Sequence, residues 1–206
     1  MPLETDFAAC PAADRAAAVS VNPAAAARAR ARIAGLCLVG EEIAVPIPIR
    51  YDPPGDCGLD RVMGVVGALA RLPEAEAILL FDAGTCLTAT LGIRGEGVVG
   101  GAILPGPDLM ARSLAEGTAR LPLVEPAPPI SPIGGSTVES IRSGVAAAFA
   151  GAARELVQRF RAACDRPFRV VAAGTGAGAL AAAVPEIDTV HPFATLWGVY
   201  RTARAD

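Results

Sequence analysis

The sequence of 206 residues lacks lysine altogether, and each of its 18 basic residues is an arginine. A P-loop lysine, a Schiff-base lysine and a lysine general base are therefore excluded as catalytic groups. Histidine occurs once, as His191, so a Ser-His or Cys-His catalytic pair would depend on that one position. His191 is followed by Pro192, and we interpret it as a surface or capping residue.

Other features in short supply exclude further kinds of protein. The five cysteines never occur as C-x-x-C, which argues against a zinc site or a disulfide framework and favours reduced thiols. A net charge of −3 gives no general field for holding a phosphate polymer, which argues against nucleic-acid binding. The longest uncharged run, residues 170–185, is too short to span a bilayer, and residues 1–10 show no secretory signal. We therefore expect a cytoplasmic protein that binds neither nucleic acid nor membrane.

Hydrophobic residues make up 52% of the chain, and their spacing alternates between strand-like and helix-like patterns. From residue 77 onward the predicted order is three strands, a helix, a long helix, a strand and short helices. This order predicts an α/β protein with a mixed sheet and flanking helices. Strands are predicted at residues 7–10, 36–39, 43–49, 77–81, 86–93, 98–104 and 168–173, and helices at residues 23–33, 59–72, 105–116, 136–161, 177–184 and 193–203.

Asp82, Gly84 and Thr85 directly follow an apolar strand, at the point where open α/β sheets place their ligands. Gly84 lets backbone N–H groups approach an anion, and the Thr85 hydroxyl adds one more donor. The Asp82 carboxylate is suited to hold a cation or a water molecule beside a phosphate. The alternative interpretation is an ordinary turn with a capping aspartate.

A second candidate, Gly58-Leu59-Asp60-Arg61, lies at the predicted start of a helix. There the Asp60 carboxylate is placed to accept a proton from a substrate hydroxyl, and Arg61 to bind a substrate anion. The alternative is an acid that the helix dipole favours at this position whatever its role.

The order of the glycine-rich segments is more specific than any one of them. Gly58-Leu-Asp-Arg61 precedes Asp82-Ala-Gly-Thr85, and residues 100–106, 114–122 and 135–144 follow. This series resembles the type III pantothenate kinase family, whose members carry G-x-D-R, D-x-G-T, G-G-x-I-x-P-G, T-x-x-L-P and a later threonine in that order. The resemblance implies an RNase-H-like (actin-like ATPase) fold with two such halves facing a nucleotide cleft, usually in a homodimer. It also implies ATP-dependent phosphorylation of pantothenate, the first step of coenzyme A biosynthesis.

The same resemblance implies the residues and cofactors of such a kinase, the latter being ATP, magnesium and a monovalent cation, potassium or ammonium. The roles that carry over are the general base, Asp60; the pantothenate-binding stretch, Gly58, Leu59, Asp60 and Arg61; a further substrate contact, Thr137; the ATP contacts, Gly84 and Thr85; and the cation ligand, Asp82. Such a set performs phosphoryl transfer without a lysine.

The sequence departs from the family at its beginning. Members open with a strand that ends in D-x-G-N-T, the first phosphate-binding turn, whereas the only asparagine here is Asn22. We therefore interpret residues 1–73 as the remnant of an incomplete first RNase-H-like half and residues 74–206 as the second half. Three interpretations stay open: an active kinase whose true start lies upstream, a shortened and catalytically inactive homologue that acts as a small-molecule-binding or regulatory protein, and an α/β domain whose motifs match by accident.

Overall fold

The computed structural model describes residues 15–205, so the strand predicted at residues 7–10 lies outside the described residues. Most of the other predicted elements are present, with their ends shifted by a few residues. In chain order the elements are β1 (Ala16–Ala18), α1 (Pro23–Arg32), β2 (Leu36–Leu38), a 3-10 turn (Pro54–Asp56), α2 (Leu59–Arg71), β3 (Ala77–Ala83), β4 (Cys86–Ile93), β5 (Gly97–Pro105), α3 (Pro107–Glu116), α4 (Thr137–Ala163), β6 (Phe168–Ala173), α5 (Ala177–Ala183), β7 (Thr189–Val190) and α6 (Ala194–Ala203).

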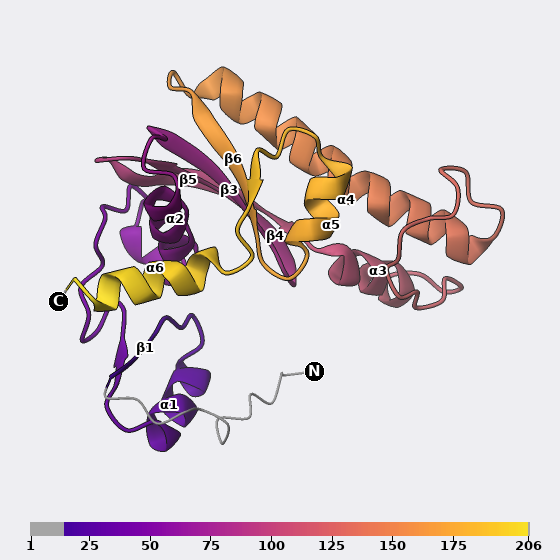
Figure 1. The fold of residues 1–206 in the computed structure, drawn as a ribbon. Coiled ribbons are helices and arrows are strands. Elements are labelled where there is room, and N and C mark those ends of the chain that lie inside the picture. The colour runs from indigo at the N-terminus through magenta and orange to yellow at the C-terminus, as the bar shows by residue number, and fades with distance from the viewer. Residues whose placement is uncertain (1–14, 206) are drawn as a thin grey trace.

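Five strands form one mixed sheet in the order β5-β4-β3-β6-β7 (Figure 1). The hairpins β3–β4 and β4–β5 are antiparallel, because each pair is joined by a tight turn. β6 lies parallel to β3 and β7 parallel to β6, after connections that contain helices. The prediction of an α/β protein with a mixed sheet and flanking helices is confirmed.

The central strand β3 has a hydrophobic core on each of its faces. Ile78 and Leu80 pack against side chains of α2 and α6. Leu79 and Phe81 pack against side chains of α4 and α5 on the other face. Because successive side chains of a strand point to opposite faces, the continuous apolar run of β3 serves both layers.

Helices α2 and α6 cross in direct backbone contact, because each has a glycine at the crossing. A Cβ atom placed on Gly67 would lie 1.9 Å from the Ala194 carbonyl oxygen, and one on Gly198 would lie 1.9 Å from the Met63 carbonyl oxygen. Any larger side chain at either position would therefore push the two helices apart.

The C-terminal end of α2 is fixed to the sheet by Arg94, the residue that follows β4. Its guanidinium donates to the carbonyl oxygens of Leu69 and Leu72, both at 2.9 Å, and of Ala75 at 3.0 Å. These are carbonyls that the end of a helix and the following turn leave without helical partners. Arg94 thereby helps to set the direction of α2 across the sheet.

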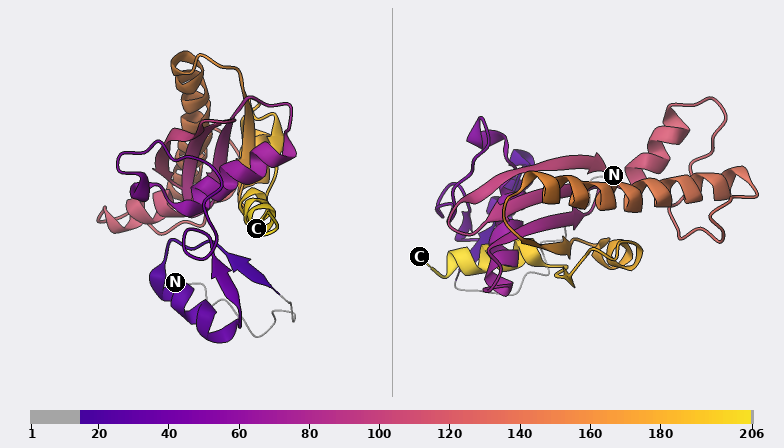
Figure 2. Two further views of the ribbon diagram at one scale, coloured as in Figure 1. Left: turned by 90° about the vertical axis from the view of Figure 1, so that its left-hand side faces the viewer. Right: turned by 90° about the horizontal axis from the view of Figure 1, so that it is seen from above.

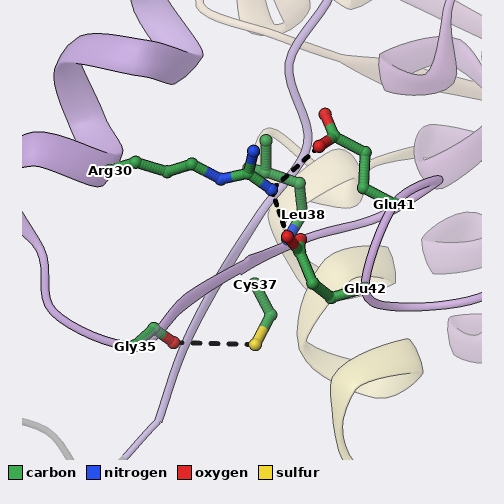
Figure 3. Close-up of polar contacts among 6 residues, drawn as sticks. All are labelled: Arg30, Gly35, Cys37, Leu38, Glu41 and Glu42. Carbon is green, nitrogen blue, oxygen red and sulfur yellow. Dashed lines mark hydrogen bonds and ion pairs between the residues drawn. The ribbon is translucent and has the colours of Figure 1, made fainter.

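Strands β1 and β2 form a separate parallel pair that makes a small module with α1, beside the main sheet (Figures 1 and 2). A two-stranded sheet is marginally stable by itself, so its side contacts matter. Arg30 of α1 forms ion pairs with Glu41, at 2.9 Å, and with Glu42 (Figure 3). Glu42 also accepts the Leu38 N–H at 2.8 Å, so α1, β2 and the turn after it are tied together.

The strand predicted at residues 43–49 is wrong. The ends of this segment make only isolated bridges, one of which joins Ile49 to Val98 of β5. Pro46 and Pro48 lack the N–H groups that a strand ladder requires, so the segment passes from the module to the main sheet without regular pairing.

Helix α4 extends well past the end of the sheet. Its middle and last turns pack on the sheet through Phe149 and Val157, whereas Ile141 and Val145 pack against α3 in a separate small cluster. With 27 residues the helix is about 40 Å long, and its first turns project together with α3 (Figures 1 and 2). Neither α4 nor any other helix within residues 15–205 is long and apolar enough to cross a membrane.

Candidate functional site

The position of Asp82 follows from the register of β3. Ile78 and Leu80 face α2, and the alternation of the strand places Asp82 on the same face, where the apolar core ends. Burial raises the pKa of the Asp82 carboxyl, and the nearby charge of Asp60 raises it further. No ion pair among residues 15–205 involves Asp82. A cation bound beside Asp82 would therefore stabilise the charged form of its carboxylate.

Asp60 lies in the first turn of α2, on the same face of the sheet. Its carboxylate accepts the backbone N–H of Arg61 at 2.8 Å, and the positive end of the helix dipole favours its charge. Gly58 leaves the space that this side chain occupies, since a Cβ atom there would lie 2.5 Å from Asp60 Oδ1. The structure thus brings Gly58, Asp60 and Asp82 together, although their motifs are one helix and one strand apart in the chain.

Arg61 is held against strand β4 and is 8% exposed. Its Nε donates to Thr90 Oγ1 at 3.0 Å and its Nη2 to the Ala89 carbonyl at 3.4 Å, while the guanidinium lies 5.5 Å from the centre of the Tyr51 ring. A Cβ atom on Gly101 would lie 2.3 Å from Arg61 Nη2. The second glycine of the G-G-x-I-x-P-G motif therefore makes room for this guanidinium.

The turn between β3 and β4 is exposed at Gly84 and Thr85. It is braced from two other strand ends: the Gly106 N–H donates to the Thr85 carbonyl at 3.0 Å, and the Gly176 N–H donates to the Ala83 carbonyl at 2.8 Å. A Cβ atom on Gly106 would lie 2.5 Å from the Gly84 carbonyl oxygen. Gly106 and Gly176, which follow two other strands, thus fix one turn whose outer surface stays open to an anion.

Gly174, which follows β6, packs directly against Asp82. It has a φ of +84°, and a Cβ atom there would lie 2.4 Å from Asp82 Oδ1. Only glycine adopts this backbone conformation without strain and also leaves room for the carboxylate. In the sequence, Gly174-Thr175-Gly176 after a strand is compatible both with the close approach of a ligand and with a simple turn, so the pattern alone did not place Gly174 beside Asp82.

Thr137 is not brought to this group of residues within one chain. It is the first residue of α4, is exposed, and follows Ser136, whose hydroxyl accepts the Glu139 N–H at 3.2 Å. α4 packs on the face of the sheet opposite to α2, and its first turns project beyond the sheet (Figure 1). Leu59, by contrast, lies beside Asp60 in α2, packed against the core below the helix.

The donor set suits a phosphoryl-transfer site with one lightly coordinated cation. Within residues 15–205, no group of three or more His, Cys, Asp and Glu residues is arranged to hold a metal ion. Asp60 and Asp82 supply two carboxylates on the same face of the sheet, near enough for the charge of Asp60 to raise the pKa of Asp82. This arrangement fits a cation that takes most of its ligands from backbone, water or substrate phosphates.

Comparison with known proteins places the chain in one family. The family model described as type III pantothenate kinase matches residues 3–159. The type III pantothenate kinase of Dehalococcoides mccartyi strain 195 is 35% identical over 162 residues, which cover 79% of this chain and 62% of that protein. A type III pantothenate kinase of Thermus thermophilus is 34% identical over 155 residues, covering 75% and 61%. The chain therefore spans about three-fifths of the length of the curated relatives it matches.

A solved structure from Campylobacter jejuni, of a protein assigned to the Baf family of transcriptional activators, is similar in fold. The similarity has a TM-score of 0.62 and covers 95% of this chain and 84% of that one, at 16% sequence identity. At this identity the two proteins share a fold, and the comparison carries no statement about activity.

Proposed function

Because the chain belongs to the type III pantothenate kinase family, we propose that it transfers the γ-phosphoryl group of ATP to the hydroxyl of pantothenate, the first step of coenzyme A biosynthesis. The observation that carries this proposal is that Asp82 and the start of α2 with Asp60 lie on one face of the sheet, near enough for the Asp60 charge to raise the pKa of Asp82, next to the exposed Gly84–Thr85 turn. A base, a cation ligand and an anion-binding turn at one end of a sheet are the parts that phosphoryl transfer requires.

In this proposal Asp60 is the general base. Its carboxylate accepts the proton of the pantothenate hydroxyl as the oxygen attacks the γ-phosphorus, and the start of α2 holds the carboxylate in place. Gly58, Leu59 and Arg61 form the rest of the pantothenate-binding stretch. The bonds from Arg61 to Thr90 and Ala89 fix its guanidinium, so the remaining N–H groups bind an anionic substrate with little loss of side-chain entropy.

The nucleotide is proposed to bind at the β3–β4 turn. When bound, ATP would supply the transferred phosphoryl group, and magnesium would neutralise part of the charge of the phosphates. Gly84 offers its backbone and Thr85 its hydroxyl to the phosphates, and Asp82 holds a monovalent cation, potassium or ammonium. The raised pKa of Asp82 supports this role, since a nearby cation would remove the cost of its charge.

The strand order β5-β4-β3-β6-β7 supports an RNase-H-like half of an actin-like ATPase fold. We propose that residues 74–206 are the second half and residues 1–73 a remnant of the first. We also propose a cytoplasmic homodimer. A second copy is the most direct means of bringing Thr137, the first residue of α4, to a substrate bound at Asp60.

Calorimetric titration of ATP, with magnesium and potassium and with or without pantothenate, tests this function. We expect saturable ATP binding, followed by pantothenate-dependent release of ADP. Asp60→Asn is expected to lower turnover by about a hundredfold or more with ATP still bound, since general-base catalysis contributes about that much. Asp165 is an exposed acid in the turn before β6, and Asp165→Asn is the matched control, which is expected to change neither turnover nor ATP binding.

Absence of ATP binding in a folded, monodisperse preparation would overturn the kinase proposal. The alternative would then be the better account: a shortened, catalytically inactive homologue that binds a small molecule or a partner protein.

A further inference from the structure

A cavity of about 440 Å³ lies between the end of α2 and the start of α6, outside the Asp60–Asp82 site. Its lining includes Arg71 of α2 and the segment that leads from β7 into α6, with the side chains His191, Phe193, Leu196, Trp197 and Tyr200. The volume falls in the range of small-molecule sites, which is roughly 300–1,000 Å³.

The charge of the cavity lining is positive and comes from Arg71. Arg71 is an exposed residue whose guanidinium lies 4.2 Å from the centre of the Trp197 ring, and no ion pair among residues 15–205 involves it. Burial and the Arg71 charge lower the pKa of His191, so the imidazole is neutral at physiological pH. Among the described residues, no acidic side chain lines the cavity.

The remaining walls are apolar and unusually exposed. Phe193 is 71% exposed and Leu196 66%, and the Trp197 and Tyr200 rings stack at 5.2 Å. Trp197 Nε1 and His191 Nε2 are buried and have no hydrogen-bond partner among the described residues. Each is a buried polar group whose missing hydrogen bond costs free energy, so a rearrangement that gives it a partner is favourable.

From these contacts we infer that the cavity binds a small amphipathic organic anion, a carboxylate joined to an aromatic or aliphatic body. The carboxylate of the ligand forms an ion pair with Arg71. The apolar part of the ligand packs on Phe193 and Leu196 and removes their exposed surface from water. A second copy of the chain is disfavoured at this face, because an isologous contact would bring the two Arg71 cations toward each other.

This site goes beyond the proposed kinase function and is separate from its residues. One backbone contact connects the two places: the Gly174 N–H donates to the Pro192 carbonyl at 3.1 Å, and Gly174 abuts Asp82. The binding test therefore needs no catalytic activity, and its failure would leave the kinase proposal untouched.

Trp197 is the only tryptophan in the chain, so its fluorescence reports directly on the cavity. We propose titrating the full chain with 4-phenylbutyrate, with 4-phenyl-1-butanol, which has the same body without the charge, and with acetate, which has the charge without the body. We expect the carboxylate to cause a saturable change in Trp197 fluorescence. The alcohol should bind about tenfold more weakly, because it lacks one charge-assisted hydrogen bond and such a bond contributes about that much to affinity. Acetate is expected to bind more weakly than either.

Two variants and one control complete the test. Arg71→Gln is expected to weaken 4-phenylbutyrate binding about tenfold and to abolish its advantage over the alcohol. Phe193→Ala, an exposed change that leaves the core intact, is expected to weaken both ligands. Arg201→Gln removes the same charge from the last turn of α6, outside the cavity, and is expected to change nothing.

The inference is overturned if no saturable change occurs, if the alcohol binds as well as the carboxylate, or if Arg71→Gln and Arg201→Gln behave alike. Sedimentation velocity on the same samples checks the competing occupant. A dimer that Phe193→Ala dissociates would show that a second copy covers this face, and would also overturn the inference.

Discussion

The two faces of strand β3 differ at a single step. On the α4 and α5 face the strand stays apolar to its end, with Phe81 and Ala83 both buried. On the α2 and α6 face the apolar side chains stop at Leu80, and the next residue on that face is Asp82. One strand therefore supplies a closed core to one layer of helices and an open polar end to the other. The candidate site lies where one core stops before the sheet does.

The largest change in the free energy of unfolding is expected from a substitution on the closed face of β3, at Phe81. Phe81→Ala would leave a cavity among Leu79, Val157 and Leu180, and we expect it to lower the free energy of unfolding by about 3–5 kcal/mol. Urea denaturation measures this loss. A loss below about 1 kcal/mol would show that the α4 and α5 face is not the closed core described above.

A glycine that touches the polar end gives the next largest effect. Gly174→Ala combines a positive φ with a clash against Asp82 Oδ1 and the Ala83 carbonyl, so we expect a loss of about 1–3 kcal/mol and weaker ligand binding at the site. Gly178→Ala in α5 is the matched control. Nothing lies within 4 Å of its added Cβ, and helix propensity predicts a gain of about 0.5–1 kcal/mol. Equal effects of the two changes would contradict the packing of Gly174 on Asp82.

Local patterns were sufficient to predict most of this fold. Apolar runs and hairpin turns located β3, β4, β5 and β6, and an N-cap with a following proline located the start of α1. The short strands β1 and β7 were not predicted, since three and two residues carry no readable period. The apolar residues of α4 at helical spacing predict a buried stripe of Val138, Ile141, Val145, Phe149, Ala152 and Leu156. Ile141, Val145 and Phe149 are buried, whereas Val138 is exposed and Ala153 and Val157 are buried instead of Ala152 and Leu156, because the contact surface follows steps of four residues from Ile141 onward.

The candidate site was predictable only in part. Motif order pointed to Asp60 and Asp82, and the strand register then accounts for their approach. The fixed position of Arg61 was not predictable, because Thr90, Tyr51 and Gly101 come from three separate segments and meet only in the folded chain. His191 was interpreted as a surface or capping residue, whereas it is half-buried with its Nε2 fully enclosed.

Asp82→Asn is expected to raise the free energy of unfolding, and by less than Phe81→Ala or Gly174→Ala lowers it. The folded pKa of Asp82 lies above its ordinary value of about 3.9, so between these two values the folded protein binds more protons than the unfolded chain. Stability of the unmodified protein therefore falls as pH rises through that window. The asparagine variant lacks this fall, so its advantage should grow with pH and level off above the folded pKa.

Unfolding midpoints of Asp82→Asn and the unmodified protein across pH 3–8 test this sign, and potassium provides the control. A cation bound at Asp82 stabilises the folded state, so potassium should narrow the difference, whereas a cation that does not fit should leave it unchanged. A variant less stable than the parent at neutral pH would contradict the description of Asp82 as a carboxylate with no ion pair among residues 15–205.

The smallest effect on stability is expected from Gly58→Ala, which separates fold from site most sharply. Gly58 has a φ of −53°, a conformation that alanine adopts freely, so the free energy of unfolding should change by less than about 0.5 kcal/mol. The added Cβ would nevertheless lie 2.5 Å from Asp60 Oδ1 and must displace that carboxylate. We therefore expect the carboxyl resonance of Asp60 to shift. The pKa of Asp82 should fall toward its ordinary value as the Asp60 charge moves away. The rate of any phosphoryl transfer should drop by at least tenfold, since misplacing a reacting group by about 1 Å is costly. Gly55→Ala, in the preceding turn with open space around its Cβ, is the control. If both alanine variants keep the resonance and the turnover of the parent, the first turn of α2 does not hold Asp60 in the position from which a base must act.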